Sequence, residues 1–278
     1  MAIRITTLSE NTASNGEILA EWGLSILIET GQANILFDTG KSVSAGHNAD
    51  TLGVDLGKVD KIVLSHSHGD HTGGLKEILR KMRKEVEIVA HPDVWDAKYA
   101  RRPGEADRYI GIPSRRYELE NMGARFHLTR EPVTLAENIM TTGEVPMVTD
   151  YEKVDSALFI KVEAGWQPDT VADDQAIIIS TPSGLVVILG CAHRGIINTL
   201  YHAQKLTGTD KIHTVIGGSH LLDANEERLW LTIAALRELD APRLGLCHCT
   251  GQSAACLLAQ EFGEGFFFNR AGTITDLT

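Results

Sequence analysis

The chain has 278 residues, of which 43% are hydrophobic and 23% charged, a composition typical of a folded protein with a sizeable core. Its formal net charge of −11 disfavours non-specific binding to nucleic acid or anionic lipid. The first residues lack a basic segment followed by an apolar one, and no apolar run is long enough to cross a bilayer. We therefore predict a cytoplasmic protein with no nucleic-acid partner and no membrane partner.

The cysteines are too few for a disulfide scaffold in a chain of this size, and they lie late in the sequence: Cys191, Cys247, Cys249 and Cys256. Reduced thiols near a metal site are the expectation, since His193 and His248 lie beside them. Cys256 falls in an apolar helical stretch and is predicted to be a core residue. Cys247 and Cys249 alternate about His248, so in a strand they would point away from its side chain and serve packing.

Apolar runs separated by turn residues predict strands at residues 3–8, 24–30 and 34–40. A more continuous run at residues 61–65 predicts a buried strand that ends directly on a cluster of histidines. Helical spacing of Leu75, Ile78, Leu79 and Met82 then predicts a helix leaving that cluster, and residues 85–91 form the next strand.

Residues 93–130 interrupt this pattern and carry a local concentration of arginines, namely Arg101, Arg102, Arg108, Arg115 and Arg116. One interpretation is a lid or substrate-facing insertion that attracts an anionic group, with Arg115 and Arg116 as substrate-binding residues. The other is a solvated loop with a short helix.

The second half repeats the alternation of strands and helices. Strands are predicted at residues 176–181, 185–190, 213–218 and 244–248, and helices at about 196–206 and 225–239. Asp223 and Glu226 are placed to form a capping box, and Gly208 and Gly263 to close helices. Because there is no linker and no low-complexity segment, we predict a single α/β domain over residues 1–278, with room for two sandwiched halves.

The residues with the clearest chemistry are Ser65-His66-Ser67-His68-Gly69-Asp70-His71, at the end of a hydrophobic strand. Three imidazoles and a carboxylate can face two adjacent metal ions only if the strand gives way to a turn, which Gly69 permits. The sequence therefore predicts a metal site at this strand end.

The segment HSHGDHTGG resembles the H-x-H-x-D-H signature of the metallo-β-lactamase superfamily, and ILFDTG resembles its upstream strand and Asp-x-Gly turn. This resemblance implies a four-layer αββα sandwich with two divalent metal ions, usually zinc and sometimes iron or manganese. It also implies that His66 and His68 bind the first ion, and Asp70 and His71 the second.

The same resemblance implies ligands further along the chain. His248 matches the final histidine of the family, and the strand at 185–190 leads to Cys191-Ala192-His193. The loop that normally supplies another histidine falls at Asp173-Asp174-Gln175, so His193 is expected to replace that imidazole. The usual bridging carboxylate has no clear equivalent. Cys191, as an additional ligand, and Asp174, which is also a substrate-binding candidate, are the alternatives for that role.

Several segments, from HGDHTGGL and TTGEVP through GCAHRGIINTL and IGGSHLL to HCTG and GTITDL, together resemble dihydropterin-ribofuranosylaminobenzene-phosphate synthase-like proteins. The resemblance spans nearly the whole chain. It departs at Met147, where the pattern favours Arg after Glu-Val-Pro, and this weakens the transfer of a phosphate-binding role.

These features support three hypotheses. The first is a metal-dependent hydrolase that attacks a small anionic, phosphorylated substrate with a metal-bound hydroxide. Asp70 would orient the hydroxide, and His220 would polarise the substrate or donate a proton, unless it is only a hydrogen-bonded turn histidine. The alternative is a transferase that uses a pterin diphosphate, and the third is a non-catalytic metal-binding or electron-transfer protein. The sequence leaves open the substrate, the metal and its occupancy, and whether the chain is a homo-oligomer.

Overall fold

The computed structural model describes residues 2–277, and within them the chain divides into two compact, interleaved units. Unit 1 contains the residues up to 130, residues 154–173 and the residues from 271 on. Unit 2 contains residues 131–153 and 174–270. The prediction that residues 1–278 form a single domain depends on how these units associate, and it stays a prediction.

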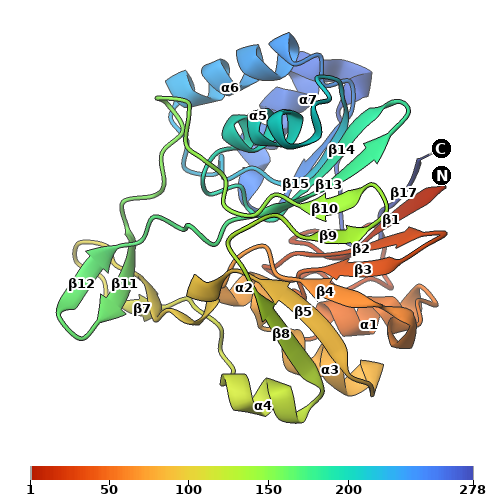
Figure 1. Ribbon diagram of the computed structural model, residues 1–278. Coiled ribbons are helices and arrows are strands. Elements are labelled where there is room, and N and C mark those ends of the chain that lie inside the picture. Colours follow the sequence, from red (N-terminus) through yellow and green to blue (C-terminus); the bar gives the residue numbers. More distant parts are fainter. Residues whose placement is uncertain (1, 278) are drawn as a thin grey trace. The chain divides into compact units, whose positions relative to one another are not determined.

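The main sheet of unit 1 brings the ends of parallel strands to one edge (Figure 1). Its strands run in the order β17 (Ile274–Leu277), β1 (Ile3–Ser9), β2 (Ser25–Thr30), β3 (Asn34–Phe37), β4 (Lys61–Val63), β5 (Val86–Ala90) and β8 (Ala124–Leu128). The pairs β17–β1, β1–β2 and β2–β3 are antiparallel. The pairs β3–β4, β4–β5 and β5–β8 are parallel. The turns that follow β3 and β4 therefore lie side by side.

Helices α1 (Ser44–Thr51) and α3 (Leu75–Met82) pack on this sheet through one apolar core. The predicted stripe of α3 is confirmed, because Leu75, Ile78, Leu79 and Met82 are all buried in that core. Short helices complete this part of unit 1: α2 (Gly69–Thr72), α4 (Arg116–Asn121), and the 3₁₀ turns η1 (Leu56–Lys58) and η2 (Pro92–Trp95).

The stretch 93–130 separates into two parts. Its end contains α4 and then β8, the edge strand of the main sheet. Its beginning supplies β6 (Lys98–Ala100) and β7 (Arg108–Tyr109) to a small sheet with β11 (Leu158–Val162) and β12 (Gly165–Pro168), in the order β12-β11-β6-β7. In Figure 1 this small sheet stands away from α1 and α3, and the residue after β7 contacts α2, since Gly69 N donates to the carbonyl oxygen of Ile110 at 2.7 Å. Whether it acts as a lid stays a prediction.

The sheet of unit 2 runs in the order β16 (Leu244–Cys247), β15 (Ile212–Gly218), β14 (Gly184–Leu189), β13 (Ala176–Thr181), β10 (Ile139–Thr141) and β9 (Thr134–Ala136). Strands β14, β15 and β16 are parallel. Helices α5 (Ile196–Thr207), α6 (Glu226–Glu238) and α7 (Gln252–Phe262) cover one face of this sheet (Figure 1) and share its core. The 3₁₀ turns η3 (His248–Thr250) and η4 (Gly263–Gly265) flank α7.

Two local predictions in unit 2 are wrong. Asn225, not Asp223, caps α6, because its side chain accepts a hydrogen bond from the backbone N–H of Arg228 at 2.9 Å. Cys256 lies on α7 as predicted but is exposed, since the buried stripe of that helix passes through Ala254, Ala255 and Leu258. Gly208 does close α5, in the left-handed conformation.

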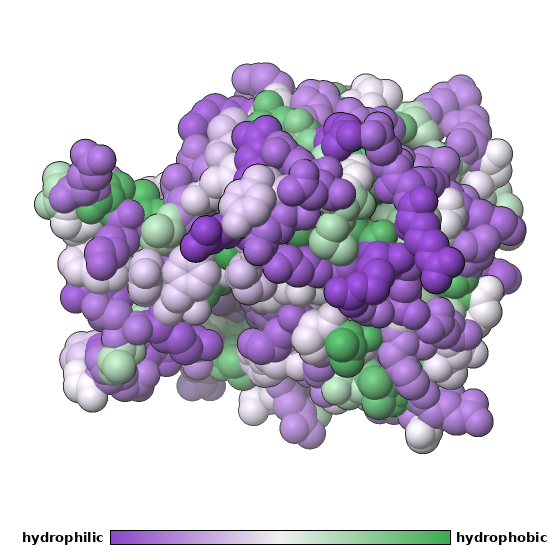
Figure 2. Space-filling model, turned by 90° about the horizontal axis from the view of Figure 1, so that it is seen from below, coloured by the Kyte–Doolittle hydropathy of each residue, from purple (hydrophilic) through white to green (hydrophobic). Residues whose placement is uncertain are grey.

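The surface in Figure 2 is mainly hydrophilic, and its hydrophobic residues lie in small separate patches. Among residues 2–277, no helix is both long and apolar enough to span a bilayer.

The α3 core predicts a clear stability difference between two residues of one helix. Ile78→Ala should lower the free energy of unfolding by about 2–5 kcal/mol, because it leaves a cavity where a fully buried side chain packs. Arg80→Ala, on the exposed side of α3, should change it by less than about 0.5 kcal/mol. Urea denaturation of the two variants tests this, and equal midpoints would contradict the packing assigned to α3.

Candidate metal centre

In unit 1 the histidine loop is organised around the carboxylate of Asp38, which follows β3. Asp38 is fully buried and has a left-handed backbone, with φ of 60°. It accepts hydrogen bonds from Ser65 N at 2.7 Å, from Ser65 Oγ at 2.6 Å, and from His71 Nδ1 at 2.7 Å. One carboxylate therefore joins the end of β3 to both ends of the histidine motif.

This arrangement fixes the tautomers of two histidines. A serine hydroxyl carries one proton, and Ser65 gives it to Asp38. The 2.8 Å contact between Ser65 Oγ and His66 Nδ1 is then a hydrogen bond donated by His66. His71 Nδ1 donates to Asp38 in the same way. In both neutral rings the lone pair thus lies on Nε2, the state that a metal ligand requires.

His68 lies between them in sequence and close to them in space. Its ring centroid is 4.5 Å from that of His66, and the centroids of His66 and His71 are 4.3 Å apart. Burial lowers the pKa of His68 to about 3, so its imidazole is neutral at neutral pH. Asp70, in the first turn of α2, accepts a hydrogen bond on Oδ2 from Trp22 Nε1 at 3.1 Å. A carboxylate oxygen of Asp70 also lies within 4.8 Å of a ring nitrogen of His71, so the structure brings the four predicted ligands of unit 1 together.

Glycines after the motif let its backbone lie directly on the turn that follows β3. A Cβ on Gly74 would lie 2.0 Å from the carbonyl oxygen of Thr39, and one on Gly73 would lie 2.0 Å from that of Lys41. Thr39 N and Oγ1 both donate to the carbonyl oxygen of His71, at 2.7 and 2.9 Å. The two glycines of HTGG therefore cannot be replaced by larger residues while the segment stays packed on the turn of ILFDTG.

A buried ion-pair network holds the backbone between His66 and His68. Asp173 Oδ2 accepts from Ser67 N at 2.9 Å, and its other oxygen pairs with Lys98 Nζ. Lys98 is 1% exposed and also contacts Asp169 at 3.2 Å. Burial lowers the pKa of Lys98, but the two carboxylates outweigh it and raise that pKa above its ordinary value. The sequence reading missed Asp38 and Lys98, although the Asp-x-Gly turn was a signal for the first.

In unit 2, donor residues gather where three parallel strands end. Cys191 and His193 follow β14, His220 follows β15, and His248 and Cys249 follow β16. Each strand end also holds a non-glycine residue with positive φ: Ala192 at 51°, His220 at 49° and His248 at 53°. Such strained backbone is common where a site requires it.

Cys249 is not the packing residue that strand alternation predicted. Because the chain enters a 3₁₀ turn at His248, the thiol of Cys249 accepts a hydrogen bond from His220 N at 3.2 Å and lies 3.4 Å from the carbonyl oxygen of Cys191. Burial raises the pKa of this thiol, but its hydrogen bonds and the nearby His248 and His220 bring it well below its ordinary value. His220 packs against His193, with ring centroids 4.1 Å apart.

The two remaining groups of predicted site residues have local partners. Asp174 is buried in unit 2, where Oδ2 accepts from Arg194 N at 2.9 Å. Arg115 is the N-cap residue of α4, and its backbone N–H donates to the side chain of Glu118. Arg116 pairs with Glu120 at 2.7 Å and lies 5.8 Å from the ring of Phe126.

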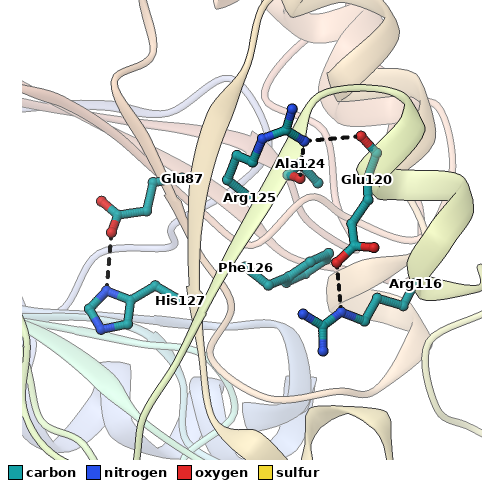
Figure 3. Close-up of a pocket in the computed structure, with 7 residues that line it drawn as sticks. All are labelled: Glu87, Arg116, Glu120, Ala124, Arg125, Phe126 and His127. Carbon is teal, nitrogen blue, oxygen red and sulfur yellow. Dashed lines mark hydrogen bonds and ion pairs between the residues drawn. The ribbon is translucent and has the colours of Figure 1, made fainter.

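Arg116 lines a surface pocket of about 580 Å³ on α4, β5 and β8 (Figure 3). The arginines of this pocket already have carboxylate partners, since Arg116 pairs with Glu120 and Arg125 with Glu85, and His127 Nδ1 lies 3.1 Å from Glu87. Elsewhere in the arginine-rich stretch, Arg101 pairs with Asp107. Substrate binding by Arg115 and Arg116 stays a prediction.

The donor sets of both units fit divalent metal ions. Unit 1 offers two imidazoles held in one tautomer, those of His66 and His71, beside a carboxylate, and unit 2 offers imidazoles and thiols whose ligand atoms lie within 4.8 Å of one another. His193 and His248 belong to unit 2, whereas His66, His68, Asp70 and His71 belong to unit 1. Their predicted convergence on one centre stays a prediction.

The sequence model of the metallo-beta-lactamase superfamily matches residues 23–248, so the chain belongs to that superfamily. Its fold is the metallo-β-lactamase fold, as predicted, and this fold generally binds divalent metal ions.

Two similar proteins extend over the whole chain. The 7,8-dihydropterin-6-methyl-4-(β-D-ribofuranosyl)-aminobenzene-5′-phosphate synthase of Methanocaldococcus jannaschii is 35% identical over 281 residues, 98% of this chain and 96% of its own. The crystal structure of Tm1679, a metal-dependent hydrolase of the β-lactamase superfamily, matches 99% of both chains with a TM-score of 0.85 and 28% identity. A diphosphatase of the PhnP family, with a TM-score of 0.54 and 12% identity, shares the fold alone. The predicted resemblance to the synthase-like proteins is thereby confirmed.

The hydrogen bonds of Asp38 predict that this carboxylate supports metal binding without touching the metal. Asp38→Asn should weaken metal affinity by about 10- to 100-fold, because Asp38 uses both oxygens as acceptors and an amide has only one. The NH₂ group of the amide would face either Ser65 N–H or the pair of donors Ser65 Oγ and His71 Nδ1. Asp60→Asn, at an exposed carboxylate that accepts from Asn34 N, is the control and should bind metal as the parent does. Competition with a chelator measures the affinity, and ¹⁵N NMR of the imidazoles reports their tautomers. Equal affinities in the two variants would refute this role.

The buried cation of unit 1 should be important for stability. Lys98→Met leaves the carboxylates of Asp169 and Asp173 buried without their cation and should cost about 3–5 kcal/mol of unfolding free energy. Lys76→Met removes an exposed pair with Glu118 and should cost less than about 1 kcal/mol. Denaturant melts of both variants check the difference. A Lys98→Met protein as stable as the control would show that the network contributes nothing.

Proposed function

We propose that this chain is a metal-dependent transferase that joins a dihydropterin unit to a phosphorylated ribofuranosylaminobenzene. The observation that carries the proposal is the 35% identity to the M. jannaschii synthase across 98% of this chain. In the reaction, a carbon or nitrogen nucleophile of the aminobenzene displaces diphosphate from the methyl carbon of a dihydropterin-methyl diphosphate. The departing diphosphate takes the electron pair of the broken C–O bond, and the nucleophile loses a proton.

The predicted ligands of both units would bind the metal ions in this proposal. His66, His68, Asp70 and His71 would hold divalent ions together with His193 and His248. Such ions, when bound, polarise phosphate oxygens and stabilise the charge of a leaving group. Zinc is the first choice, with iron or manganese as alternatives.

Two further residues would act on the substrate. His220 lies beside His193, and its buried Nδ1 has no hydrogen-bond partner in the described structure. It is the candidate that donates a proton to the departing diphosphate. Asp70, which Trp22 orients through its indole N–H, would position the nucleophile.

Hydrolysis is the second candidate function, favoured by the full-length match to Tm1679. Here water takes the place of the aminobenzene, and the remaining parts are the same. The anionic small-molecule substrate and the cytoplasmic location are part of both proposals.

Product analysis in H₂¹⁸O separates these functions. The metal-loaded enzyme, given dihydropterin-methyl diphosphate and ribofuranosylaminobenzene 5′-phosphate, should release diphosphate and the joined product in equal amounts, without ¹⁸O. Hydrolysis would instead give ¹⁸O-labelled pterin alcohol whether or not the second substrate is present. Failure to release diphosphate in any condition would refute both.

Asp70→Asn should lower kcat/KM at least about 100-fold and reduce the metal content, while the melting temperature without metal stays near that of the parent. Asp50→Asn, at an exposed carboxylate on α1 that pairs with Lys81, is the matched control and should retain parental turnover.

A further inference from the structure

Cys191 lies at the meeting point of two donor groups in unit 2. One consists of Cys191, His193 and His220, and the other of Cys191, His248 and Cys249. In each group the candidate ligand atoms all lie within 4.8 Å of one another. Bonds of about 2.0–2.3 Å to nitrogen and sulfur place the ligands of one ion roughly 3–4 Å apart. Cys191 with His193, and Cys191 with His248, therefore need only a small contraction to bind one ion each.

Parallel strand ends and a glycine position the two donor groups. Strands β14, β15 and β16 are parallel, so the loops after them reach the same edge of the sheet. Gly218, at the end of β15, lies against the cluster, and a Cβ there would be 2.6 Å from Cys249 Sγ and 2.4 Å from the carbonyl oxygen of Gly190. Any larger residue at 218 would displace the thiol.

The position of Cys191 also matches a gap in the family pattern. Metal centres of this superfamily normally have a carboxylate that bridges the two ions, and the sequence left Cys191 and Asp174 as alternatives for it. Asp174 is in neither of the two unit 2 groups, and its Oδ2 accepts a hydrogen bond from Arg194 N. Cys191 is in both groups.

We infer that Cys191 is a thiolate ligand shared by two metal ions, in the place of the bridging carboxylate. The inference rests on the metal dependence in the proposed function, and it goes beyond it by assigning the ligand and the class of metal. Metal binding at Cys191 would release the thiol proton to solvent, and the thiolate has lone pairs enough to serve as a shared ligand. Because thiolate and imidazole are soft or borderline ligands, the centre selects zinc or ferrous iron over magnesium, calcium or manganese.

Cobalt(II) substitution tests the inference without any assay of turnover. The parent, stripped with a chelator and titrated with Co²⁺, should bind two ions and develop a thiolate-to-cobalt charge-transfer band. Cys191→Ser should lose most of this band and bind both ions at least about tenfold more weakly, since one shared ligand serves both. Cys256→Ser, at the exposed thiol of α7, is the control and should match the parent.

Two further variants make the result decisive. Cys249→Ser can weaken one binding step at most, so a charge-transfer band that disappears in Cys249→Ser but persists in Cys191→Ser overturns the inference. Cys191→Asp restores a carboxylate and should bind two Co²⁺ ions with no more of the band than Cys191→Ser keeps, which also provides a test if Cys191→Ser does not fold. A parental band in Cys191→Asp would likewise refute a Cys191 ligand. If the band assigns Cys191 but no pterin product forms, the proposed function fails and the inference stands.

Discussion

The buried carboxylate of Asp38 is the constraint on which the histidine loop of unit 1 depends. A charge without solvent is tolerated only where hydrogen bonds replace its hydration, and Asp38 receives them from Ser65 and His71. The same bonds determine which nitrogen of His66 and His71 carries the proton. Packing of the loop and its readiness for metal are therefore consequences of one interaction, and the glycines after the motif allow the backbones to come close enough for it to form.

In unit 2 the backbone conformation helps to position the candidate metal ligands. Its candidate ligands follow parallel strands, and a residue in the left-handed conformation turns the chain at each strand end: Ala192, His220 and His248. A non-glycine residue in that conformation costs on the order of 1–3 kcal/mol and persists only where the surrounding structure holds it. The core beneath β14, β15 and β16 supplies that support. In unit 1 the hydrogen bonds of Asp38 orient the histidines, whereas in unit 2 left-handed backbone at each strand end adds to the hydrogen bonds of Cys249.

Elements with strong apolar periodicity could be predicted from the sequence, as could the histidine motif at the end of β4, because both depend on neighbours along the chain. The features that were missed depend on distant pairs. Asp38 acts on a residue 27 positions away, and Lys98 on one 75 positions away. The alternation rule failed at Cys249 because it assumes that the strand continues, whereas η3 begins at His248. The cap of α6 fell at Asn225 and not at Asp223 because the helix begins at Glu226, which places Asp223 too far upstream to reach its first turn.

The distribution of charge bears on how an anionic substrate would be held. The arginine-rich stretch was the main basic feature of a chain with a net charge of −11, yet Arg101, Arg102 and Arg116 each face a carboxylate of unit 1. An ion pair presents little net field to a ligand at physiological ionic strength. In the proposed function, attraction of a diphosphate would then come mainly from the metal ions that the centre would hold. Metal binding and substrate binding would be coupled, and the residues that fix the ligands, Asp38 above all, would influence substrate affinity without touching the substrate.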